Sequence, residues 1–116
     1  MPFIDMQLSK KLDYAEKQKL QAVATEIVAE TMGKPAGAVM VSVHDGCDLY
    51  MGGEVLISGL YMEIRAFGPS ESAVKETMAR ELNKAIKSLL QISEQHIYIT
   101  FEDKMQWGFK GGYLEK

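Results

Sequence analysis

The chain has 116 residues, 47% of them hydrophobic and 25% charged, and a formal net charge of −3 at pH 7. These values are typical of one compact domain that buries a single core. The slightly acidic chain lacks the basic character of a nucleic-acid-binding surface, and no apolar run reaches the roughly 18 residues that cross a bilayer. We therefore predict one soluble domain, residues 1–116, with no nucleic-acid and no membrane partner.

The first half of the chain reads as strand, helix, strand. Residues Pro2 to Leu8 are extended, and the stretch from about Tyr14 to Met32 carries apolar residues at helical spacing until Gly33 ends it. A second alternating strand runs from Val39 to Asp45. The residues expected to form the buried stripe of this helix are Leu20, Val23, Ala24, Ile27 and Thr31.

The second half repeats that order. Residues Val55 to Phe67 read as one extended run, Ser70 as the N-cap of a helix, and Ile97 to Asp103 as the closing strand. The remaining segment, Met105 to Lys116, is too aromatic for a disordered end. The buried stripe expected for the second helix is Val74, Met78, Leu82, Ala85, Ile86 and Leu89.

The two halves look like an internal duplication. Their closing strands occupy equivalent places, and each is followed by a pair of glycines, Gly52-Gly53 and Gly111-Gly112. A repeat near half the chain length indicates one supersecondary unit used twice. We therefore predict an α/β (α+β) fold, a four-stranded sheet with two helices, made of two β-α-β units at about residues 1–53 and 54–116.

The composition of the sheet predicts an assembly. The run Val55–Phe67 carries apolar side chains on both of its faces, whereas two helices cover only one face of a small sheet. Tyr98, Met40 and Tyr61 would lie on the uncovered face. A symmetric homo-oligomer would bury them, and the alternative is a monomer whose second face is modestly polar.

Pro2 is the candidate catalytic residue. An initiator methionine before a small residue is usually removed, which would leave a chain that begins with the secondary amine of Pro2. An α-amine has a pKa of roughly 7.7–8.0, and burial beside a cation lowers that pKa because both effects disfavour the protonated form. Such an amine can accept and return a proton near neutral pH, as keto-enol chemistry requires. The alternative is a second-position proline with no chemical role.

Several short segments occur in the order found in one known family. They are Pro2-Phe-Ile, Gly33-Lys34-Pro35, the long strand ending in Ile64, Gly68-Pro69-Ser70-Glu71, Tyr98-Ile-Thr100 and the aromatic, glycine-containing tail. Over essentially its whole length the chain resembles the tautomerase superfamily, and within it a bacterial-type homologue of the macrophage migration inhibitory factor family. The resemblance implies a homotrimer of ferredoxin-like β-α-β protomers, with active sites at subunit interfaces and Pro2 as general acid and base.

The resemblance also implies two substrate contacts from the proline's own chain. Lys34 would bind the substrate carboxylate, and its ammonium would help to lower the pKa of the Pro2 amine. Ile64 would offer its backbone amide and an apolar wall. Without the family, Lys34 would read as an exposed lysine in the turn after a helix.

Four further residues carry over as substrate contacts. Tyr98 and Thr100 project to the same side of their strand, so that a neighbouring subunit would contribute both to the pocket. Phe109 and Tyr113 match the tail positions where the family places aromatics over the substrate ring. The alternative for these aromatic residues is packing at a subunit boundary.

The chain departs from the family pattern in several places. Thr100 stands where the animal cytokine has an asparagine, and Glu63 replaces a serine, so that a carboxylate there would repel an acidic substrate or pair with a basic side chain. The two-cysteine redox motif is absent around Val55–Ser58, so we predict no thiol-disulfide activity. If Met1 is retained, the Pro2 nitrogen is a tertiary amide without a basic lone pair.

The sequence gives little support for other chemistry. Cys47 is the only cysteine and cannot form an internal disulfide. His44 and His96 have no acidic or cysteine partner spaced for a metal, and neither a glycine-rich phosphate loop nor a serine elbow is present. We therefore predict no metal and no cofactor.

Three functions stay open. The preferred one is a tautomerase acting on an α-keto acid such as phenylpyruvate, which Pro2, Lys34 and Ile64 together favour. The others are a cytokine-like signalling or ligand-binding trimer with little turnover, and a plain structural trimer. No charged and then apolar signal precedes the domain, so we expect a cytoplasmic protein, although members of the family can also leave cells without such a signal.

Overall fold

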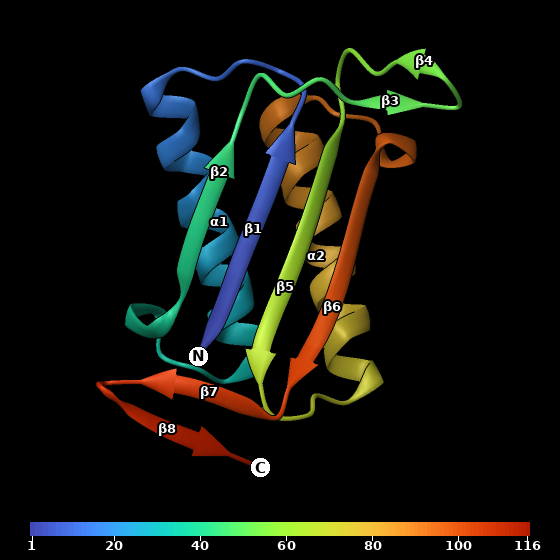
Figure 1. Cartoon of the computed structure of the whole chain (residues 1–116). Coiled ribbons are helices and arrows are strands. Elements are labelled where there is room, and N and C mark those ends of the chain that lie inside the picture. The colour runs from blue at the N-terminus through green and yellow to red at the C-terminus, as the bar shows by residue number, and fades with distance from the viewer.

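The computed structural model describes residues 1–116 as one four-stranded sheet with two helices on one face and a short hairpin at each end (Figure 1). The hairpins lie at opposite ends of the sheet. The elements in chain order are β1 (Pro2–Leu8), α1 (Tyr14–Met32), the 3-10 turn η1 (Ala36–Ala38), β2 (Met40–His44), β3 (Tyr50–Met51), β4 (Glu54–Val55), β5 (Leu60–Phe67), α2 (Ser72–Leu90), the 3-10 turn η2 (Glu94–His96), β6 (Ile97–Lys104), β7 (Gln106–Phe109) and β8 (Gly112–Glu115).

The sheet has the strand order β2-β1-β5-β6. The strands β1 and β2 are parallel and joined by α1, and β5 and β6 are parallel and joined by α2. The two β-α-β units meet in the middle of the sheet, where β1 and β5 are antiparallel. This arrangement confirms the predicted fold class, and the repeat boundaries at residues 1–53 and 54–116 stay a prediction.

Local signals account for the bounds of α1. Asp13 and Glu16 form a capping box, in which the Glu16 backbone N–H donates to the Asp13 carboxylate over 2.8 Å and the Asp13 N–H donates to the Glu16 carboxylate over 3.0 Å. Gly33 ends the helix with a φ of 65°, in the left-handed region that glycine adopts without a Cβ clash. The predicted span Tyr14–Met32 is confirmed.

The predicted cap of α2 was wrong by one residue. The N-cap is Glu71, not Ser70, and its side chain makes no capping hydrogen bond. Its carbonyl instead accepts the N–H groups of Val74 and Lys75. The start of α2 is therefore set by the backbone and by the residues that the helix packs on the sheet.

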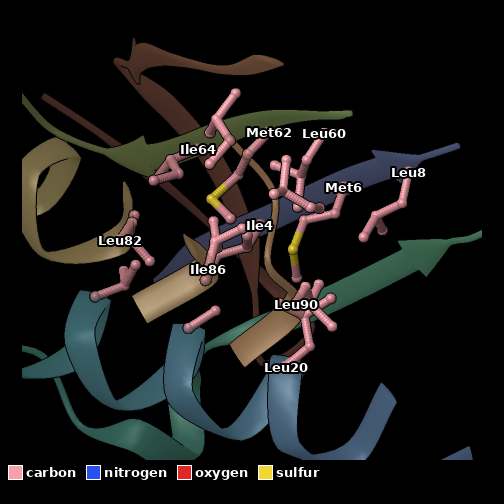
Figure 2. Close-up of a cluster of buried hydrophobic side chains, with 14 of the residues drawn as sticks. Ile4, Met6, Leu8, Leu20, Leu60, Met62, Ile64, Leu82, Ile86 and Leu90 are labelled. Carbon is pink, nitrogen blue, oxygen red and sulfur yellow. The ribbon is translucent and has the colours of Figure 1, made fainter. Parts of the chain in front are cut away.

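A single core fills the space between the helices and the sheet (Figure 2). Every second residue of β1 and β5 points toward the helices and is buried, as a strand with one covered face requires. Of the first expected helical stripe, Val23, Ile27 and Thr31 are only half-buried, because they face α2 across a surface groove. The fully or nearly buried core residues on the helices are Leu20, Ala24, Val28, Met78, Leu82, Ile86 and Leu90.

The expected extended run from Val55 to Phe67 is interrupted. Val55 belongs to the β3–β4 hairpin, and β5 begins only at Leu60. The interruption centres on Gly59, whose N–H donates to the Ser9 hydroxyl over 2.8 Å and whose carbonyl accepts the Ser9 N–H over 3.1 Å. A Cβ at Gly59 would collide with the Leu56 side chain, so any larger residue here would require Leu56 to move.

The two glycine pairs have matching roles in the structure. Gly52-Gly53 forms the turn between β3 and β4, and Gly111-Gly112 lies at the turn between β7 and β8. The aromatic tail is therefore ordered, as predicted, and it forms a hairpin that the sequence analysis did not predict. Neither α1 nor α2 is long and apolar enough to cross a membrane.

Candidate active site

Pro2 is the first residue of β1, which is one of the two central strands of the sheet. It pairs with Ala66 on β5, and its side chain is fully buried on the helix-facing side. Met1 precedes it and is half-buried. An amine at this end of β1 therefore sits against packed protein on one side.

Lys34 supplies a positive charge next to the N-terminal amine. It follows the left-handed Gly33, and its backbone N–H donates to the Ala29 carbonyl over 2.9 Å, which fixes the turn after α1. Burial, and then the nearby Lys34 ammonium, lower the pKa of the Met1 α-amine from its ordinary value. Because its pKa is lowered, an amine at this position is neutral and able to accept a proton at a lower pH than a fully solvated α-amine is.

The hollow that includes Lys34 does not reach Pro2. It has a volume of about 550 Å³ and lies along α1, and Pro2 is not among its lining residues. Within one chain, this hollow therefore does not contain both the lysine and the proline.

Ile64 lies in the sheet beside Pro2, but its side chain belongs to the core. It pairs with Ile4 of β1 and Phe101 of β6, and only 2% of the residue is exposed (Figure 2). Its side chain points toward the helices, so its expected use as an apolar wall stays a prediction.

Tyr98 and Thr100 do not meet Pro2 within one chain. Both lie on the open face of the edge strand β6, where the Thr100 hydroxyl is 3.1 Å from the Tyr61 hydroxyl and Tyr98 is 60% exposed. Pro2 pairs with Ala66, whereas Tyr98 pairs with Tyr61, five positions farther along β5. At about 3.3 Å per residue, this offset places Tyr98 roughly 16 Å from Pro2 along the strand direction.

Phe109 and Tyr113 lie on the β7–β8 hairpin. This hairpin leaves the sheet at the end where β1 begins (Figure 1). Phe109 is 40% and Tyr113 62% exposed, and they stand on neighbouring cross-strand pairs, Phe109 with Gly112 and Tyr113 with Gly108. The structure thus places both aromatics at the same end of the sheet as Pro2, and exposed.

The open face beside this site carries an ionic cluster that the sequence analysis missed. Arg65 donates to Glu63 over 2.6 Å, approaches Asp5 to 4.0 Å and lies over the Phe3 ring at 5.6 Å. Of the two outcomes expected for Glu63, pairing with a basic side chain is therefore observed. The i, i+2 spacing of Glu63 and Arg65 could have indicated this contact, because such residues share one face of a strand.

No group of three His, Cys, Asp or Glu residues lies close enough together to hold a metal ion. His44 instead approaches Asp5 to 3.5 Å and Ser42 to 2.9 Å. The candidate site consists of the amine, Lys34, and Phe109 and Tyr113 at the same end of the sheet.

The model of the macrophage migration inhibitory factor family matches residues 1–114 of the chain. Comparison with curated protein sequences gives no significant match. The family model thus spans nearly every element described above, from β1 into β8.

Solved structures with the same fold add three points of comparison. The MIF2 protein of Leishmania major superposes with a TM-score of 0.89 at 24% identity, over 98% of this chain and 97% of that one. A protein inactivated by 2-oxo-3-pentynoate gives 0.87 at 19% identity, over 97% and 94%. A symmetric trimer of fused wild-type 4-OT gives 0.84 at 18% identity, over 95% and 93%.

Proposed function

The chain belongs to the macrophage migration inhibitory factor family, and we propose that it is a keto-enol tautomerase that acts on an α-keto acid such as phenylpyruvate, with the nitrogen of Pro2 as general acid and base. The observation that carries the proposal is the environment of the N-terminal amine. Burial and Lys34 lower the pKa of the Met1 α-amine at the start of β1, which supports a lowered pKa for the Pro2 amine once Met1 is removed.

In the proposed reaction, Met1 is first removed and Pro2 begins the chain as a neutral secondary amine. Its nitrogen takes a proton from the carbon next to the substrate carbonyl, so that a C–H bond breaks and an N–H bond forms. The electron pair of the C–H bond forms the carbon-carbon double bond of the enol, the π pair of the carbonyl moves to its oxygen, and that oxygen takes up a proton from water. The reverse transfer, from the protonated amine to carbon, gives the keto form.

Lys34 is the proposed partner of the substrate carboxylate. An ammonium group attracts a carboxylate strongly where both are partly shielded from water. The inactivation of a structural relative by 2-oxo-3-pentynoate, itself a 2-oxo acid, supports a site of this substrate class. Phe109 and Tyr113 would cover an aryl substituent from the β7–β8 hairpin.

We further propose that the working unit is a homotrimer in which Tyr98 and Thr100 reach the Pro2 site of a neighbouring subunit. Their separation from Pro2 within one chain supports this arrangement, as does the trimeric state of a structural relative. The proposed partners are thus further copies of the chain and a small keto or enol acid. We place the protein in the cytoplasm.

The second candidate is a ligand-binding or signalling trimer with little turnover. If Met1 were retained, the Pro2 nitrogen would be an amide without a basic lone pair. The shape of the pocket would survive this change, whereas proton transfer would not.

An assay of phenylpyruvate enol separates the two functions. Protein whose intact mass shows that Met1 is absent should accelerate ketonisation, and Pro2→Gly, which replaces the secondary amine by a primary one, should retain part of that activity. Processed protein that binds phenylpyruvate but does not accelerate its ketonisation would favour the binding function.

A further inference from the structure

A hollow of about 470 Å³ lies between α2 and the start of β6, on the opposite side of the sheet from the open face. It is lined by Arg80, Asn83, Lys84, Lys87, Glu94 and Ile97. Pro2 pairs with Ala66 on β5, and Ala66 pairs with Asp103 on β6. Ile97 lies six positions before Asp103 on β6. At about 3.3 Å per residue this offset amounts to roughly 20 Å, so the hollow is separate from the candidate active site.

The cations around this hollow come from one stripe of α2. Arg80, Lys84 and Lys87 follow one another at spacings of four and three residues, which places their side chains on the same side of the helix. The turn η2 closes the hollow with Glu94, and the nearly buried Ile97 forms an apolar part of its lining.

Only one of these cations is neutralised within the chain. The Lys87 ammonium lies 2.8 Å from the Glu94 carboxylate, which lowers the pKa of Glu94 and keeps it ionised. The other ion pairs of the chain join different residues, so neither Arg80 nor Lys84 has a carboxylate within 4.0 Å. Asn83, which also lines the hollow, donates one N–H of its amide to the Ala79 carbonyl over 2.8 Å.

We propose that this hollow binds a doubly charged tetrahedral oxyanion, the phosphate or sulfate group of a small ligand. The three cations and one carboxylate leave two positive charges uncompensated, which a dianion balances and a single carboxylate does not. The fork of the Arg80 guanidinium suits two oxygens of such a group, and Lys84 adds a mobile charge one turn away. The site requires neither Pro2 nor removal of Met1.

The test titrates the intact protein with inorganic sulfate and, separately, with phenyl phosphate, while the backbone amide signals of Asn83, Lys84 and Ile97 are followed by NMR. Both probes should give saturable shifts at these residues. The double variant Arg80→Gln/Lys84→Gln should bind about fivefold more weakly for each cation removed, the scale of an exposed charge pair. The matched control Lys11→Gln/Lys19→Gln removes the same charge from exposed positions elsewhere and should bind as the wild type does.

Two further measurements test whether the net charge of the hollow controls binding. Glu94→Gln removes the carboxylate that pairs with Lys87, so the net charge of the hollow rises by one and both probes should bind several-fold more tightly. A phosphate monoester loses its second charge below a pKa of about 6, so lowering the pH from 8 to 5 should weaken binding of phenyl phosphate and leave binding of sulfate unchanged. At pH 8, tighter binding of phenyl phosphate than of sulfate would assign the site to phosphate esters, and equal affinities would assign it to either anion.

Three results would overturn the proposal. They are the absence of saturable binding by either probe at millimolar concentration, unchanged affinity in the Arg80→Gln/Lys84→Gln variant with its helical circular dichroism intact, and an equal loss in the control variant. The last result would mean that the anions respond to net charge and not to this hollow.

Discussion

Lys34 is the residue whose proposed role is most readily separated from folding. Lys34→Ala should mainly raise KM for a carboxylate substrate, because a hydrogen bond to a charged group contributes about 1.5–3 kcal/mol, or roughly tenfold or more in KM. Steady-state kinetics with phenylpyruvate measure this change. The methyl ester is the control, since it lacks the carboxylate, and a comparable loss with the ester would contradict anion binding.

The pH dependence of the reaction reports on the amine itself. Burial and Lys34 lower the pKa of the Met1 α-amine, and Pro2, which is more deeply buried, would carry the amine after processing. The neutral fraction of an amine grows as the pH rises, so enolisation of phenylpyruvate should increase through an ionisation below the reference range of roughly 7.7–8.0 and then level off. Lys34→Ala should move that midpoint upward. A midpoint at or above the reference range in both proteins would mean that neither effect acts on the base.

At the scale of elements, Gly33 connects the end of α1 to Lys34. Gly33→Ala should lower the free energy of unfolding by about 1 kcal/mol, because its φ of 65° places a Cβ in the disfavoured left-handed region. Gly37→Ala is the matched control, since Gly37 has no positive φ and no atom within 4 Å of an added Cβ. Urea unfolding of the two variants measures the difference in free energy of unfolding. Equal values would show that alanine adopts the left-handed conformation at position 33 without loss of stability.

Local patterns predicted the helices better than the long strand. The bounds of α1 follow from helical spacing and a terminal glycine, both of which are local in sequence. The break before β5 depends on Gly59 meeting Ser9, a contact between residues 50 positions apart. The approach of Arg65 to Asp5 was not predicted for the same reason: it joins residues far apart in sequence, which the antiparallel pairing of β1 and β5 brings together. For the site, the place of Pro2 after the initiator methionine indicated an amine, and only the resemblance to the family indicated Lys34, whereas the distance of Tyr98 from Pro2 became visible only in the sheet.

At the scale of the whole molecule, the open face of the sheet predicts the assembly. Tyr98 is 60% and Met40 68% exposed in the single chain, and they stand on the two edge strands β6 and β2. Exposed apolar residues at both edges favour contacts with further copies of the chain. Sedimentation equilibrium should give a mass near three times 13.0 kDa. A stable monomer at micromolar concentration would contradict both the trimer and a pocket shared between subunits.

The most direct test of the proposed mechanism compares two forms of the same protein that differ only at the N-terminus. One form has lost Met1 and the other retains it, each confirmed by intact mass and by an unchanged sedimentation profile. We predict that the processed form catalyses ketonisation of phenylpyruvate enol and that the form with Met1 does not, because an amide nitrogen cannot accept a proton. Equal activity of the two forms would contradict the assignment of Pro2 as the base.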